Sequence, residues 1–265
     1  MHAQVMSLYS FHPSKLSSVE RSKKSAEMDY FWNQAKLDPE KSLPLLRVEL
    51  KQAPAGSFFL TDGSELLLSL SRATSDRELA AASLAKADLN DTQSDAYFYA
   101  VHNLAVEDIN VTDAALHILD DSRFIVSVPQ HAMTLNQSIA LMYLLLSMQG
   151  DAWIKPAKER FAKEKNTGAM LSLVSAFGYA QTDEADAALK RIAEEPSYPD
   201  AVRREAREIL DEGHKATKGG MKIKGTIAEI REQRRQRLRA VSDEALVDVQ
   251  WMTRRIAQLR AVPAH

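Results

Sequence analysis

The sequence predicts an all-α protein in which short antiparallel helix pairs stack as an α-solenoid. Only nine Gly and nine Pro occur among 265 residues. Helix interiors disfavour both residues, whereas β-rich folds need many turns, so this composition favours helices. Apolar residues also recur at helical spacing along most of the chain. The third observation is a repeated two-helix pattern in the second half, because such units bury their apolar faces by stacking.

Charge and residue composition exclude several classes of protein. Lys and Arg number 34 and Asp and Glu number 36, which gives a formal net charge of −2. A chain with this balance has no overall field that would attract nucleic acid or an anionic membrane. The absence of Cys excludes disulfides, Cys-ligated zinc and thiol catalysis. No apolar run approaches the roughly 20 residues of a membrane span.

The first four residues permit two interpretations of localisation. No hydrophobic signal core follows Met1-His2-Ala3-Gln4, which indicates a cytoplasmic protein. The same residues also match the end of an Ala-x-Ala cleavage region whose signal has been removed and to which a start Met was added. We slightly favour a periplasmic or exported protein, and both alternatives stay open.

The N-terminal part of the chain is expected to hold a loose arm followed by helices. Residues 1–24 are rich in Ser and Lys and should form a loosely ordered arm. An N-terminal helical region is expected over 25–150. Its first helix should span 25–36, because apolar residues recur there at helical spacing. Pro39 suits the first turn of a second helix, and the Pro- and Gly-containing break at 53–56 should end that helix.

Short polar motifs mark the expected starts of the next helices. Residues 61–64, Thr-Asp-Gly-Ser, are expected to form a turn that caps a helix over 65–70. Ser75 and Glu78 have the spacing of a capping box, which should open a helix that reaches about residue 86. Further helices are expected around 97–104 and over 113–119, the second of them capped by Thr112.

An irregular insertion is expected at 124–134. Residues 124–129 are rich in β-branched side chains and end in a proline, so they favour a strand or a buried loop. A strongly apolar helix should follow at 135–148. Gln130 and His131 are candidate contact residues here, because a His on a buried loop can serve as a base or a ligand. Alternatively, His131 only caps the helix that follows.

The second half of the chain repeats itself at a spacing of 31 residues. Each unit is a helix, a short turn and a second helix, and the two units span 153–180 and 184–212. Each helix has one apolar stripe that it cannot bury alone, so neighbouring units should stack. The matched pairs are Ala157 with Ala188, Arg160 with Arg191, Phe161 with Ile192, Ala162 with Ala193, Leu171 with Val202, Ser175 with Ala206, and Tyr179 with Leu210.

This pattern resembles the short HEAT-like repeats of the bilin-lyase type over residues 153–212. The resemblance implies an α-solenoid of stacked antiparallel helix pairs over about 151–213, with a concave face for binding. It implies no chemistry, because such repeats serve scaffolds, inhibitors and some enzymes. Arg160 and Arg191, which occupy equivalent positions in the two units, are candidate contacts with a partner.

A C-terminal helical hairpin is expected over 221–262, after a linker at 214–220. Nine Lys or Arg and two Glu lie between residues 215 and 239, among them the candidate contacts Arg234 and Arg235. In one interpretation the hairpin caps the solenoid or pairs with a second copy as a homodimer. In the other it forms a basic patch for phosphates or acidic partners. The patch lacks interleaved aromatic residues, which disfavours nucleic acid as the partner.

No catalytic motif stands out in the sequence. The seven His include no pair at metal-ligand spacing on one helical face, and no Gly-rich nucleotide motif occurs, so we expect no metal and no cofactor. We therefore predict a non-enzymatic binding or scaffold protein of bacterial type that presents a curved helical surface to another protein. The alternative is an enzyme or small-ligand-binding protein with its site near 124–131.

Overall fold

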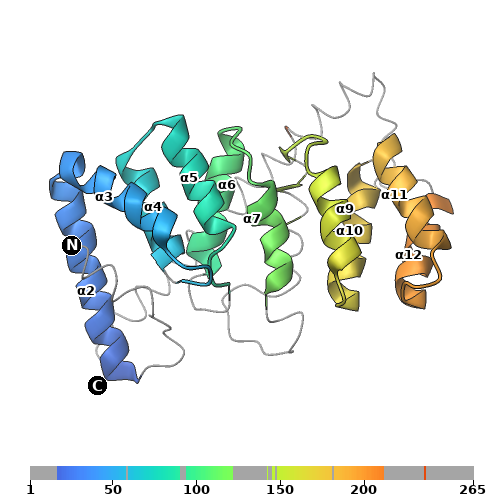
Figure 1. Cartoon of the computed structure of the whole chain (residues 1–265), viewed down its shortest axis with the longest axis horizontal. Coiled ribbons are helices and arrows are strands. Elements are labelled where there is room, and N and C mark those ends of the chain that lie inside the picture. The colour runs from blue at the N-terminus through green and yellow to red at the C-terminus, as the bar shows by residue number, and fades with distance from the viewer. Residues whose placement is uncertain are drawn as a thin grey trace. The chain divides into compact units, whose positions relative to one another are not determined.

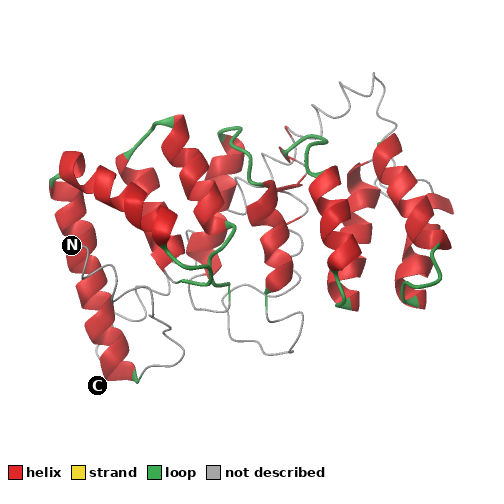
Figure 2. Ribbon diagram, in the orientation of Figure 1, coloured by secondary structure: helices red, strands yellow, loops and turns green. Residues whose placement is uncertain are grey.

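The computed structural model confirms that the protein is all-helical. It describes residues 17–57, 59–89, 94–121, 142, 145–146, 148–180, 182–211 and 236. The structure is 78% helical, and the described ranges hold ten α-helices, one short 3₁₀ helix and no strand (Figure 2). The chain divides into two compact units, 1–216 and 217–265, and all of these helices belong to the first.

Helices contact those that lie close to them in chain order. Among the described helices, every pair with substantial contact lies within two places along the chain, and Figure 1 shows α9 and α10 beside α11 and α12. The buried apolar side chains form one core, which extends from Phe31 to Ile209. The helices are α2 (Ser18–Leu37), α3 (Pro39–Gln52), α4 (Phe59–Leu70), α5 (Thr74–Leu84), α6 (Ser94–Val106), α7 (Thr112–His117), η2 (Ile118–Asp120), α9 (Ile154–Lys163), α10 (Thr167–Ala180), α11 (Asp183–Glu194) and α12 (Asp200–Asp211).

The first helix begins earlier than the sequence analysis predicted. Helix α2 starts at Ser18 rather than Ser25, so residues 18–24 of the predicted arm are helical. Ser17 and Glu20 form a capping box: the Glu20 amide donates to Ser17 Oγ at 3.4 Å, and the Ser17 amide donates to Glu20 Oε2 at 3.0 Å. These contacts satisfy free amides of the first helical turn. The Ser-x-x-Glu signal was therefore present in the sequence, at a position that the prediction treated as an arm.

The predicted turn at 61–64 was wrong, because these residues lie inside α4 and are all buried. A Cβ atom at Gly63 would lie 2.9 Å from the Phe59 ring and 3.0 Å from Leu50 Cδ2, so α3 packs closely where Gly63 has no side chain. Ser64 Oγ donates to the Leu60 carbonyl oxygen at 2.6 Å, which satisfies the hydroxyl within the helix. Small and short polar residues, which alone would favour a turn, here permit close helix packing.

Two predicted helix caps were also wrong. Helix α5 starts at Thr74, and no side chain caps it, so Ser75 and Glu78 do not form the predicted capping box. Helix α7 starts at Thr112 itself, and Asn110 Oδ1 accepts a hydrogen bond from the Thr112 amide at 3.0 Å. In both places the sequence marked the start of a helix correctly within about two residues but assigned the wrong side chain to the cap.

The two repeat units match in their first helices and shift by one residue in their second. At a spacing of 31, buried residues of α9 meet buried residues of α11; in the second helices the same match needs a spacing of 32. The connection at 195–199 is longer than the one at 164–166, which accounts for a shift. The predicted partners Leu171 and Ser175 are therefore only half-buried, and Ala162 is exposed. The buried pairs are Ile154 with Ala185, Ala157 with Ala188, Phe161 with Ile192, Met170 with Val202, Val174 with Ala206, and Phe177 with Ile209.

Several predicted segments lie outside the described residues. These are the insertion at 124–134, the linker at 214–220 and, except for Gln236, the hairpin at 221–262. Four residues of the predicted helix at 135–148 are described, and all four are helical and buried. Within the described part of the chain, no helix is long and apolar enough to cross a membrane.

Candidate functional site

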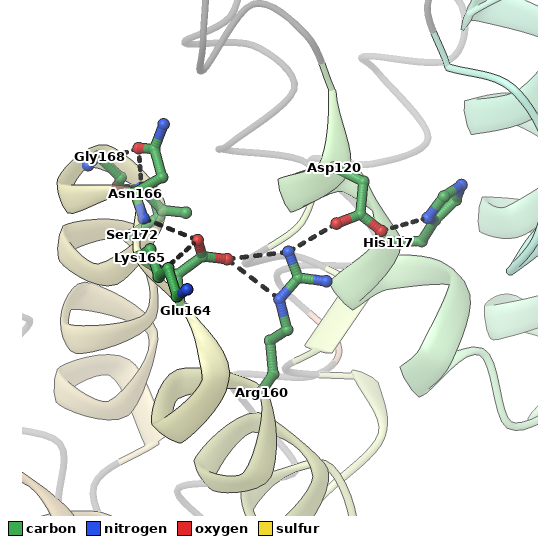
Figure 3. Close-up of polar contacts among 9 residues, drawn as sticks. His117, Asp120, Arg160, Glu164, Lys165, Asn166, Gly168 and Ser172 are labelled. Carbon is green, nitrogen blue, oxygen red and sulfur yellow. Dashed lines mark hydrogen bonds and ion pairs between the residues drawn. The ribbon is translucent and has the colours of Figure 1, made fainter.

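Arg160, one of the predicted contact residues, is held by two carboxylates of its own chain. Its Nη2 lies 2.6 Å from Asp120 Oδ1 and 2.9 Å from Glu164 Oε2, and its Nε donates to Glu164 Oε2 at 3.2 Å (Figure 3). The side chain is 28% exposed. Asp120 belongs to η2 and Glu164 follows α9, so Arg160 joins the end of one helix to the end of the next.

His117 and Asp120 resemble the His–carboxylate pair of a general base, but the second ring nitrogen is occupied. His117 Nδ1 lies 2.7 Å from Asp120 Oδ2, and His117 Nε2 lies 2.6 Å from the Ala87 carbonyl oxygen. A carbonyl oxygen only accepts, so Nε2 carries the hydrogen of that contact. This nitrogen therefore has no lone pair free to take a proton from a substrate. The His117 contacts fix the end of α7 against the segment that follows α5.

Glu164 extends the same chain of contacts to the start of α10. Its Oε1 accepts hydrogen bonds from the amides of Lys165 and Asn166, both at 2.8 Å. Asn166 Oδ1 in turn accepts from the amides of Gly168 at 2.8 Å and Ala169 at 3.1 Å. These amides belong to the first turn of α10 and would otherwise have no acceptor within the helix. The polar chain from α7 to α10 thus positions helices.

The carboxylates of this chain of contacts stay ionised well below neutral pH. Burial alone would raise the pKa of Asp120, but hydrogen bonds from His117 and Arg160 outweigh it and lower that pKa to about 2. For Glu164, burial also raises the pKa, and the amide of Asn166 and the Arg160 guanidinium lower it further, so the net shift is downward. Two groups with lowered pKa values are poor proton donors at neutral pH, which fits a structural role.

The pH dependence of stability should reveal the Asp120 contacts. The folded pKa of about 2 lies below the ordinary value of 3.8. Ionised Asp120 therefore stabilises the folded state above about pH 4, and this stabilisation is lost as the pH falls towards 2. We expect the wild type to be more stable than Asp120→Asn near neutral pH and this difference to shrink over that range. Urea unfolding at a series of pH values measures it, with Asp113→Asn, an exposed position on α7, as control. A difference that stays constant throughout would contradict the expectation.

Arg191, the second predicted contact residue, lies at an open hollow on α11. The hollow has a volume of about 410 Å³. Arg191 and Lys190 bring positive charge to it, and Glu194 and Glu195 bring negative charge. Ser197 hydrogen bonds lower the pKa of Glu195, and the nearby Arg191 charge contributes in the same direction. The full lining consists of Ala187, Lys190, Arg191, Glu194, Glu195 and Pro196.

The structure thus describes two of the six predicted contact residues. Arg160 is engaged inside the chain, Arg191 is exposed, and His131, Gln130, Arg234 and Arg235 lie outside the described residues. The described ranges contain no group of three or more His, Asp or Glu arranged to hold a metal ion. Comparisons of the chain with models of protein families, with curated proteins and with solved structures found no match.

Sequence analysis missed the partners of Arg160. Glu164 lies four residues after Arg160 on the same helical face, a spacing at which opposite charges attract, so this contact had a sequence signal. Asp120 is 40 residues away and His117 is further still. Nothing in the local sequence indicates that α7 and α9 bring these side chains together.

Proposed function

We propose that this protein is a non-enzymatic scaffold of the HEAT-like kind, an α-solenoid that binds another protein through the exposed faces of its helix pairs. The pattern of contacts supports this proposal, because each described helix packs on helices close to it in chain order. The burial match between the two repeat units supports it as well. Stacked units of this type leave extended surfaces that serve for binding.

One observation carries the proposal further than the fold does: the hollow on α11 is open and of mixed charge. Enzyme sites usually enclose their substrate in a largely apolar pocket, with few polar groups. The hollow around Arg191 has two basic and two acidic side chains and lies on an exposed helix face. Such a surface suits the polar rim of a protein interface, where Arg is enriched. The His–Asp pair that most resembles catalytic machinery is engaged in helix packing.

A reconstitution experiment tests the scaffold function. The full chain, purified under gentle conditions from its source organism, should bring down one protein in a constant molar ratio. The two proteins, purified separately and mixed, should re-form a complex that light scattering detects during gel filtration. The proposal is rejected if no protein binds and native mass spectrometry instead finds a small molecule in equimolar amount, because that result indicates a ligand-binding protein or an enzyme.

A further inference from the structure

We propose that Arg191 binds an acidic side chain of the partner protein, in the way that Arg160 binds Asp120 within the chain. This inference rests on the proposed function and adds the chemistry of the contact. The partner residue is an Asp or Glu near the end of a helix, because Asp120, the internal counterpart, belongs to the short helix η2.

The two arginines lie in the same local frame. Each is followed four residues later by a Glu that ends its helix: Glu164 after α9, with φ −74° and ψ 141°, and Glu195 after α11, with φ −77° and ψ 109°. Both glutamates accept hydrogen bonds from backbone amides of the next turn, Glu164 at 2.8 Å and Glu195, through the Ser197 amide, at 3.3 Å. The backbone therefore presents Arg160 and Arg191 in equivalent ways.

The units differ in what completes the arginine site. Asp120, supplied by the preceding helical segment, lies 2.6 Å from Arg160. At Arg191, the described ranges of the chain supply no ion pair, and the guanidinium borders the hollow instead. An arginine next to a carboxylate-sized opening binds carboxylates well, because its planar fork matches their two oxygens. The first unit thus shows with its own residues how the second can be completed.

The charges around the hollow limit the class of ligand. Lys190 adds a second positive charge next to Arg191, which favours an anion. Glu194 and Glu195 line the same hollow and would repel a ligand that carries many negative charges. A single Asp or Glu, with neutral or basic neighbours, fits this arrangement better than a polyphosphate or a nucleic acid. The geometry therefore points to one carboxylate on a folded protein.

Zero-length crosslinking tests the contact directly in the reconstituted complex of full chain and partner. A carbodiimide joins an amine to a carboxylate that touches it, and Lys190 supplies an exposed amine beside Arg191. We expect mass spectrometry to find Lys190 joined to one Asp or Glu of the partner. Arg191→Ala should raise the Kd about 10-fold, and Arg191→Lys should raise it less because the charge remains. The matched control is Arg204→Ala, an exposed arginine on α12 that does not line the hollow.

The outcomes separate this inference from the proposed function. If the partner binds but the crosslinks lie elsewhere and Arg191→Ala binds like the wild type, the contact is wrong and the scaffold function stands. If no partner protein is found, both are overturned. Unchanged thermal unfolding of Arg191→Ala should accompany its weaker binding, because an exposed side chain contributes little to stability. A weakened Arg204→Ala variant with a normal Arg191→Ala variant also overturns the contact.

Discussion

Replacing Phe177 with alanine is expected to lower the free energy of unfolding by about 3–5 kcal/mol. The Phe177 side chain is 0% exposed in α10 and stacks on Trp153, with ring centroids 5.8 Å apart and an angle of 12° between the planes. The substitution removes this contact and leaves a cavity, because close-packed helices collapse only in part. Urea unfolding followed by circular dichroism measures the loss.

A half-exposed residue provides the control for this prediction. Leu45 on α3 is 41% exposed, so Leu45→Ala should cost about 1 kcal/mol or less. If Phe177→Ala costs no more than Leu45→Ala, the packing of α10 against the segment at Trp153 is looser than the structure shows.

The second large effect is expected for Arg47→Ala, at about 3 kcal/mol. Arg47 Nε lies 2.7 Å from Asp76 Oδ1 and Nη2 lies 2.7 Å from Asp76 Oδ2, and this two-point contact joins α3 to α5. The Asp76 side chain is only 3% exposed. Loss of Arg47 leaves a buried carboxylate with Ser71, whose Oγ donates to it, in place of a full positive charge. Thermal and urea unfolding of the variant measure the cost.

Removing the other partner should cost less, which makes the prediction directional. The Arg47 side chain is 39% exposed, so in Asp76→Ala water can solvate the guanidinium that loses its partner. The arginine control is Arg72→Ala, since Arg72 is 84% exposed and 4.0 Å from Glu107, and it should change stability by about 0.5 kcal/mol or less. Equal costs for Arg47→Ala and Asp76→Ala would show that burial of Asp76 does not dominate this pair.

The sequence predicted helices better than their ends. Apolar spacing located α2, α3 and α9 to α12 because each buries one face, and that periodicity is a local property. It failed at residues 61–64, where Gly63 and Ser64 have turn chemistry but lie in a helix that packs closely on α3. Here tertiary contact overrides local preference, and no single-chain pattern records which neighbour a helix will meet.

The candidate site was predictable only where the repeat carried the information. The spacing of 31 residues identified Arg160 and Arg191 as equivalent positions, and both precede a glutamate that ends its helix. The different surroundings of the two side chains were not predictable, because Asp120 reaches Arg160 through the packing of α7 and α9. Sequence equivalence therefore located the position, while its occupancy depends on a neighbouring helix.

The restriction of helix contacts to near neighbours also affects how this protein reaches its folded state. Contacts that join residues close in sequence close short loops, and chains with low contact order fold fast, on the microsecond to millisecond scale when they fold in one step. Each helix pair between α2 and α12 can form with the help of only adjacent pairs. The pairs at either end of this array have neighbours on one side only. Amide exchange should therefore be fastest there, with opening that proceeds inward rather than in one cooperative event.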